Sequence, residues 1–215
     1  MHRLALVLCL SVALAACASR RREPDPAPAV TGRALVAVLP FRTSGGLDDR
    51  GTFAPGPDAA AVPESAGEQA ARALSVRLSG AGVPTVDVER VLAATPPPGA
   101  AVYDARLGAR IARKVGANLA VIGAVMRYAE REGSALGVTT PASIAYQAVL
   151  VRASDAALVA FDRFDHTQQP LTSNLLDLPN FLRAGGRWMT RQEMLEGALG
   201  ETAQKLAKAL QAGGS

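Results

Sequence analysis

Cysteine and histidine are nearly absent from this sequence. Its 215 residues include two cysteines and two histidines, and both cysteines, Cys9 and Cys17, lie within the first 17 residues. Removal of residues 1–16 would leave Cys17 as the one remaining cysteine, so the domain that follows it would have no disulfide and no cysteine nucleophile. His166 is the only histidine after His2, and no nucleophile elbow or phosphate-binding glycine motif is present. The sequence therefore predicts a non-enzymatic protein without a cofactor.

Aromatic residues and long apolar runs are also scarce. Aromatic residues make up 4% of the chain, whereas hydrophobic residues make up 49%, mostly alanine, valine and leucine. This composition is typical of a packed α/β core and excludes a disordered chain. No run of about 18 apolar residues follows the N-terminal segment, which excludes a later transmembrane helix.

The excess of positive charge is small. The formal net charge is +4 and the calculated pI is about 9.5. The basic residues are mostly scattered along the chain, so we interpret them as solvated surface and expect no nucleic-acid partner.

The N-terminal segment has the three parts of a secretory signal. Basic Arg3 is followed by a short apolar run and then by small residues before Cys17. The ending Leu14-Ala15-Ala16-Cys17 resembles the lipobox of bacterial lipoproteins, in which the cysteine becomes the lipid-bearing first residue. This resemblance implies that Cys17 anchors the chain in a membrane. Ala18 resembles the outer-membrane sorting signal, so we expect an outer-membrane protein whose domain faces the periplasm.

The remaining chain divides into a tether and one domain. Residues 17–32 start with the lipidated cysteine and continue with Pro24, Pro26 and Pro28, which favour an extended tether. Arg20, Arg21 and Arg22 either contact anionic head groups or simply form a hydrophilic flank. Residues 33–213 are expected to form a single α/β domain.

Apolar periodicity and capping residues predict the order β-α-β-α-β-β-β-α. Continuous apolar runs indicate buried strands, and stripes at helical spacing indicate amphipathic helices. Ser65–Glu68 and Thr190–Glu193 have the pattern of capping boxes, Asp104 can cap a helix, and Gly116 can end it. Gly123 suggests a bulge or the close approach of a helix. The expected strands are 33–41, 84–88, 118–126, 144–153 and 158–164, and the expected helices start at 65, 104 and 190. Together they predict helices packed on a mixed sheet.

Three polar groups could carry chemistry but are better explained as surface. Asp162, Asp165 and His166 could be drawn as a metal site, although a solvated strand end is the commoner arrangement. Asp48 and Asp49 lie in a long loop, 42–63, that is either functional or mobile. A stripe of arginines on one helix could hold phosphate or an acidic glycan, but is more simply a solvated face: Arg106, Arg110 and Arg113.

Three segments carry a resemblance to a known group of envelope proteins. They are ALVAVLPF at 34–41, LGARIARKVGANLAVIGAV at 107–125 and AFDRFD at 160–165. Together they are similar to the N-terminal domain of TolB, a fold that also serves the curli secretion lipoprotein CsgG and the lipoprotein activators of penicillin-binding proteins. The resemblance covers roughly 33–165 and the last helix, and it implies binding of other proteins without catalysis. The chain lacks the propeller of TolB and the clear membrane-spanning hairpins of CsgG.

An apolar arm at 166–189 lies outside the resemblance and is our predicted partner-binding segment. Exposed aromatic and leucine side chains are typical of protein interfaces. The alternative is that the arm packs back over the sheet. The residues that would bind the partner are Leu171, Leu175, Phe181 and Trp188, with Arg183 and Arg187 as a polar rim.

Three functional hypotheses follow from the sequence. The first is an envelope assembly or accessory lipoprotein that contacts an unknown envelope protein. The second is a subunit of a CsgG-like oligomeric secretion pore. The third is an envelope hydrolase or ligand-binding protein whose cleft lies between the 42–63 loop and the 166–189 arm.

Overall fold

A five-stranded mixed sheet forms the centre of the fold. The computed structural model describes residues 33–56, 62–133, 138–168 and 188–212. Strand β1 (Val36–Val38) runs parallel to β5 (Leu119–Ala129), with Val36 opposite Leu119. The short β2 (Arg42–Thr43) also pairs with β5. Strands β8 (Ser143–Arg152) and β9 (Leu158–Thr167) follow antiparallel, which gives the order β1-β5-β8-β9.

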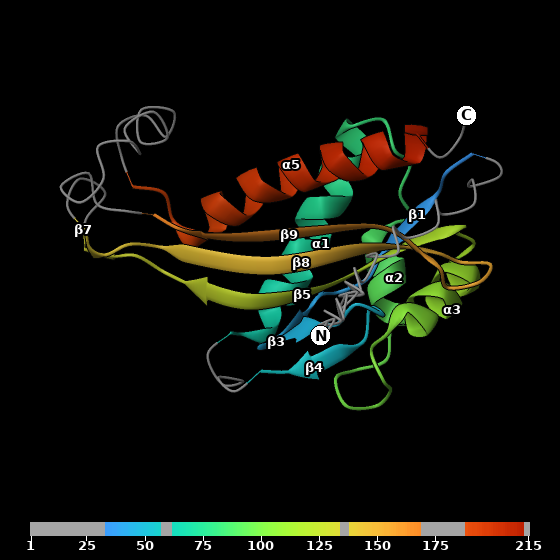
Figure 1. Cartoon of the computed structure of the whole chain (residues 1–215), viewed down its shortest axis with the longest axis horizontal. Coiled ribbons are helices and arrows are strands. Elements are labelled where there is room, and N and C mark those ends of the chain that lie inside the picture. The colour runs from blue at the N-terminus through green and yellow to red at the C-terminus, as the bar shows by residue number, and fades with distance from the viewer. Residues whose placement is uncertain (1–32, 57–61, 134–137, 169–187, 213–215) are drawn as a thin grey trace, which may run out of the picture.

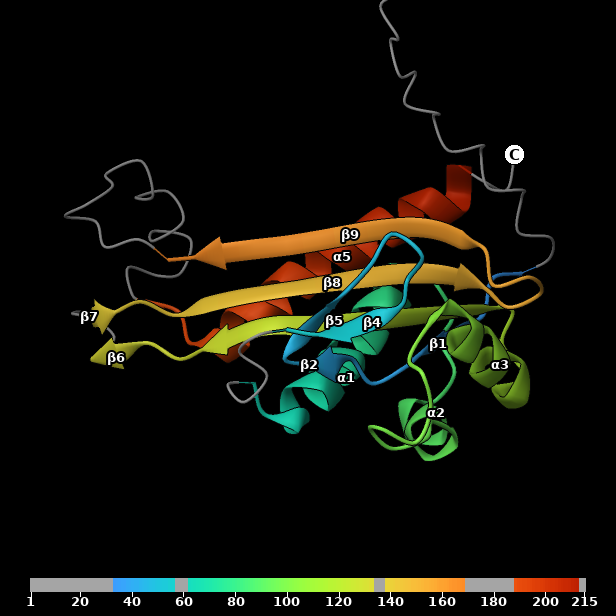
Figure 2. The ribbon, with the colours of Figure 1, turned by 60° about the horizontal axis from the view of Figure 1, so that its bottom comes forward.

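Helices cover both faces of this sheet. One face packs against α1 (Glu64–Gly80) and α5 (Arg191–Ala212), and the other against α2 (Val88–Ala94) and α3 (Ala105–Val115). The hairpin of β3 (Gly45–Leu47) and β4 (Phe53–Pro55) lies on the same side as α2 and α3, in front of the sheet in Figure 2, with α5 behind it. A second small hairpin, β6 (Glu132–Gly133) and β7 (Val138–Thr140), continues from β5 and β8 at one end of the molecule (Figure 1).

Strand β5 shows why the sheet is apolar on both faces. Side chains alternate along a strand, so Leu119 and Val121 enter the core beneath α1 and α5, whereas Ala120 and Ile122 enter the core beneath α3. A strand buried on both sides needs a continuous apolar sequence. The predicted class, helices on a mixed sheet, is confirmed.

One predicted strand is mostly absent. Residues 84–88 contribute only an isolated bridge between Val36 and Thr85. Pro84 has no N–H to extend the pairing, and α2, which was not predicted, begins at Val88. The first strand is also shorter than expected: β1 ends at Val38, before Pro40.

The helix ends confirm some of the expected caps. Thr190 N–H donates to Glu193 Oε2 at 2.9 Å and Glu193 N–H to Thr190 Oγ1 at 3.2 Å, which is a capping box. Asp104 accepts from Leu107 N–H at 2.7 Å, and Gly116 ends α3 with a φ of 82°. The box at Ser65 is wrong, because α1 begins one residue earlier, at Glu64, after an extended Pro63 that makes no side-chain cap.

The missing side chain of Gly123 makes room for an aromatic ring, and not for the helix or bulge that we expected. A Cβ at this position would overlap the ring of Phe41, which lies across the strand. The register shift of β5 falls between Val125 and Arg127 instead.

A buried chain of hydrogen bonds joins α5 to the sheet. Tyr146 Oη lies 2.7 Å from Thr202 Oγ1, which lies 2.6 Å from Asp162 Oδ2, and Lys205 Nζ reaches Asp162 Oδ1 at 2.8 Å. Thr202 has one hydroxyl proton and gives it to the carboxylate, so Tyr146 must donate to Thr202. Burial raises the pKa of Tyr146 and keeps this donor protonated.

Replacement of Thr202 by valine, which is similar in shape, tests this chain. The substitution leaves a tyrosine hydroxyl without its acceptor and a buried carboxylate without one donor, which costs about 1–3 kcal/mol. Urea denaturation should show a lower midpoint with an unchanged slope. Tyr146→Phe removes only the first donor and should cost less; an unchanged midpoint in Thr202→Val would show that the chain does not contribute to stability.

Candidate functional site

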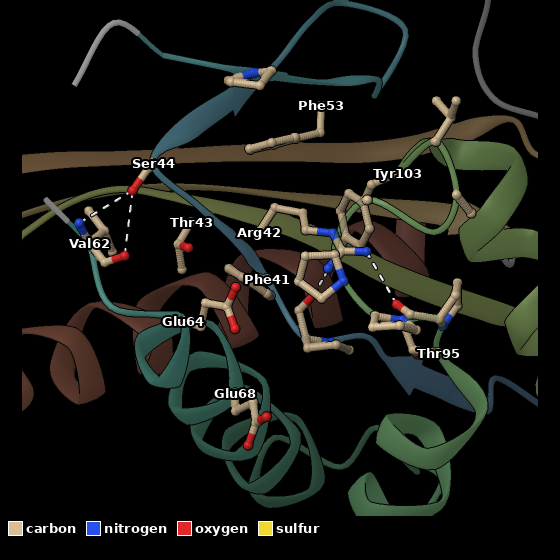
Figure 3. Close-up of a pocket in the computed structure, with 18 of the residues that line it drawn as sticks. Phe41, Arg42, Thr43, Ser44, Phe53, Val62, Glu64, Glu68, Thr95 and Tyr103 are labelled. Atoms are coloured by element: carbon tan, nitrogen blue, oxygen red, sulfur yellow. Dashed lines mark hydrogen bonds between the residues drawn. The ribbon is translucent and has the colours of Figure 1, made fainter. Parts of the chain in front are cut away.

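A cleft of about 740 Å³ opens where the parallel strands β1 and β2 end. Figure 3 shows its parts: the chain from Phe41 to Ser44, the first turns of α1, Phe53 of β4, and the segment from Thr95 to Tyr103. Ligands of open α/β sheets bind in crevices at the carboxyl ends of strands. The position therefore makes this cleft a candidate binding site.

Arg42 is the positioned cation of the cleft. Its Cζ lies 4.8 Å from the centre of the Tyr103 ring, and its Nη2 donates to the carbonyl of Pro96 at 3.3 Å. The Tyr103 hydroxyl in turn donates to the Pro40 carbonyl at 2.8 Å and accepts from the Gly123 N–H at 3.1 Å. Burial raises the pKa of Tyr103, so the phenol remains a donor. Among the described residues, no acidic side chain forms an ion pair with Arg42.

Two carboxylates of α1 lie on the opposite side of the cleft. Glu64 is in the first turn and Glu68 lies one turn later, where it also contacts Arg72 at 3.5 Å. Together with Arg42 they could hold a ligand that carries both an anionic and a cationic group. None of these three side chains is a nucleophile with an adjacent base.

The second candidate site is the outer edge of β9. This strand of ten residues is the last of the sheet, and no described residue pairs with its outer side (Figure 2). Phe161 is 56% exposed and Leu158 is 36% exposed. Both line a groove of about 380 Å³, whose other wall consists of Leu47 at the end of β3 and of Asp48, Asp49 and Gly51 after it.

The hydrogen-bond pattern shows which residues of β9 present free backbone groups. Gln168 N–H donates to the Ala142 carbonyl of the neighbouring chain segment. Backbone groups of antiparallel strands alternate in direction, so the even-numbered residues of β9 pair with β8. The odd-numbered residues 161, 163, 165 and 167 direct their N–H and C=O groups outward. Such an unpaired edge is a template for pairing with another strand.

The acidic residues of β9 do not converge on a metal. Asp162 faces α5 and pairs with Lys205, whereas Asp165 lies on the opposite face and pairs with Arg127 at 2.6 Å. The hydrogen bond from Arg127 lowers the pKa of Asp165. Among the described parts of the chain, no group of three or more potential ligands could hold a metal ion.

Most of the site residues expected from the sequence lie outside the described residues: Cys17, Leu171, Leu175, Phe181, Arg183 and Arg187. Trp188 is described and is 7% exposed, and its carbonyl accepts from Arg131 at 2.6 Å. The role of the arm in partner binding stays a prediction. The cleft that we expected between the 42–63 loop and the arm stays a prediction, because most of the arm lies outside the described residues.

The exposed apolar residues of β9 were not identified from the sequence. The sequence places two large apolar residues, Leu158 and Phe161, in the same strand as the charged Asp162, Arg163 and Asp165. The sequence does not show that β9 is the edge strand, and a buried strand would have hidden both side chains.

Comparisons with solved structures find similar folds among bacterial envelope proteins. A PelC dodecamer from Paraburkholderia phytofirmans is 15% identical, covering 87% of this chain and 94% of that chain, with a TM-score of 0.43. Lipoprotein GNA1162 from Neisseria meningitidis is 14% identical, covering 71% and 95%, with a TM-score of 0.43. The LpoB C-terminal domain from Escherichia coli is 17% identical, covering 66% and 88%, with a TM-score of 0.38.

At these identities the likeness concerns the fold alone. No protein-family model matches the sequence, and no curated protein sequence matches it either. The finer resemblance to TolB and CsgG stays a prediction. In the part of the chain that the structure covers, no helix has the length and apolar character needed to cross a membrane.

Proposed function

We propose that this chain is a non-enzymatic lipoprotein of the bacterial outer membrane, anchored through Cys17, whose domain faces the periplasm and acts by binding proteins. The observation that carries the proposal is the outer edge of β9, with which no described residue pairs, beside the exposed side chain of Phe161. Main-chain pairing along such an edge supplies affinity, and a neighbouring apolar pocket supplies specificity. The TolB-like accessory role inferred from the sequence requires a surface of this kind.

The anchor rests on the sequence around Cys17. Leu14-Ala15-Ala16-Cys17 ends a short apolar segment, and the proline-containing residues that follow would hold the domain away from the lipid. One acyl chain binds a membrane only marginally, whereas several chains on one cysteine anchor a protein durably.

Photo-crosslinking in intact envelopes tests the protein-binding role. A photoreactive phenylalanine analogue replaces Phe161 in one variant and Val76 of α1, which is 70% exposed, in the control. Both substitutions exchange an exposed apolar side chain, so both proteins should fold. We expect irradiation to attach another polypeptide at position 161 and none at position 76. Equal labelling at both positions, or none at 161, contradicts the proposal.

A second function, ligand binding in the cleft at Arg42, is favoured by one observation. This guanidinium is held by Tyr103 and the Pro96 carbonyl without a carboxylate partner among the described residues. The pore-subunit alternative would instead give a ring of subunits in detergent, which light scattering would detect.

A further inference from the structure

We infer that β9 pairs with β9 of a second copy of this chain, antiparallel and about a two-fold axis at Phe164. This inference rests on the proposed function, since it names the protein that occupies the open edge. It places Arg163 of each copy opposite Asp165 of the other.

Strand geometry restricts the registers that a two-fold pair can adopt. Hydrogen bonds across the new interface require odd-numbered residues of both copies to face each other, because only these residues direct their backbone groups outward. The permitted arrangements therefore differ by shifts of two residues in the pairing of one strand against the other. Each such shift moves the two-fold axis by one residue along β9. Each step changes which charged side chains stand opposite each other.

Among the three registers centred on residues 163 to 165, charge selects one. Centring the axis on Arg163 places this arginine opposite its own copy, and centring it on Asp165 does the same for that carboxylate. Like charges directly opposite each other on neighbouring strands are destabilising. Centring the axis on Phe164 instead creates two Arg163–Asp165 pairs between the copies. The two side chains lie on the same face of β9, where they already approach each other within one copy at 3.5 Å.

The apolar residues fit the same register. On the helix-covered face, Phe164 stacks on Tyr146 with ring centres 5.6 Å apart and would meet Phe164 of the second copy. On the other face, exposed Phe161 would lie opposite Thr167 of the second copy. Four residues per copy would exchange backbone hydrogen bonds: 161, 163, 165 and 167.

Pairs of introduced cysteines test, in the intact envelope, whether a second copy occupies the β9 edge and in which register the two strands pair. After lipidation of Cys17 no other cysteine remains in the mature chain, so introduced thiols give a clean readout. Facing residues of a hydrogen-bonded antiparallel pair have Cα atoms about 5.5 Å apart, within the range of a disulfide. We expect Arg163→Cys/Asp165→Cys to form a disulfide-linked dimer on mild oxidation, and either single variant to form no disulfide between copies.

Other outcomes of this experiment overturn the inference in distinguishable ways. A disulfide-linked dimer formed by one single variant alone means that the axis lies elsewhere. A double variant without a disulfide means that β9 does not pair with itself about Phe164. If position 161 still crosslinks to a different polypeptide, the second copy is wrong while the proposed function stands; if it crosslinks to nothing, both fail.

Charge reversal tests the inference without oxidation. The exposed Arg163 is replaced by aspartate in the mature chain carrying Cys17→Ser, and Arg106→Asp on α3 serves as the matched control. We expect sedimentation equilibrium to show a dimer for the parent and the control, and at least a tenfold higher dissociation constant for Arg163→Asp. Equal dissociation constants, or a monomeric parent, contradict the inference. A melting temperature equal to that of the parent, measured at a dilution where both are monomeric, shows that the fold of Arg163→Asp is intact.

Discussion

Gly67→Ala is expected to destabilise the domain by about 3 kcal/mol or more, the upper range for overpacking a core. Gly67 lies on the buried side of α1, and a Cβ there would overlap the backbone carbonyl oxygen of Phe41. Phe41 also donates its backbone N–H to the Gly67 carbonyl at 3.1 Å. Backbone cannot rotate away as a side chain can, so α1 would have to move from the sheet.

Gly197→Ala is the matched control. Gly197 also lies within a helix, α5, but a Cβ there meets nothing within 4 Å. Alanine is favoured over glycine in a helix by about 1 kcal/mol, so this variant should be slightly more stable than the parent. Thermal denaturation of both variants provides the comparison. Similar melting temperatures for the two would contradict the close packing of α1 on Phe41.

Truncation after Met189 is expected to abolish the cooperative thermal transition. The truncation removes α5, whose buried side includes Leu195, Leu199 and Leu206. Burial of each leucine contributes roughly 1.5–3 kcal/mol, and the sum is comparable with the ~5–15 kcal/mol that stabilises a typical domain. It also removes Thr202 and Lys205, which leaves the buried Asp162 carboxylate without two donors.

The truncation is checked by circular dichroism during heating. The full mature chain should unfold in one sharp transition, and the truncated chain should show a gradual loss of signal. A sharp transition at an unchanged temperature in the truncated chain would mean that α5 is peripheral to the core.

The central strand and the two helices with clear caps were predictable from the sequence. Strand β5 has a continuous apolar run, and α3 and α5 each combine a cap with an apolar stripe at helical spacing. These signals lie within the sequence of each element, so they can be recognised without knowledge of the fold. Residues 84–88 show the limit of such signals: their apolar alternation predicts a strand, but Pro84 opens the segment and α2 already begins at Val88, so only an isolated bridge forms.

The candidate sites depend on contacts that are distant in sequence. Arg42, Glu64 and Tyr103 line one cleft although more than 60 residues separate the first from the last. Their types alone suggested nothing, because each is common on a solvated surface. Likewise, Phe161 is a candidate binding residue only because β9 lies at the end of the sheet. The order of strands in the sheet is therefore the information that the sequence reading lacked.

Membrane fractionation of the parent and a Cys17→Ser variant tests most directly whether this chain acts as an envelope lipoprotein. The parent should remain with the outer-membrane fraction after a high-salt wash and partition into detergent, because its acyl chains and not surface charge hold it there. Cys17→Ser should be released as soluble protein or remain unprocessed, and its domain should melt at the same temperature as that of the parent. A Cys17→Ser protein that still partitions quantitatively into detergent would contradict the account.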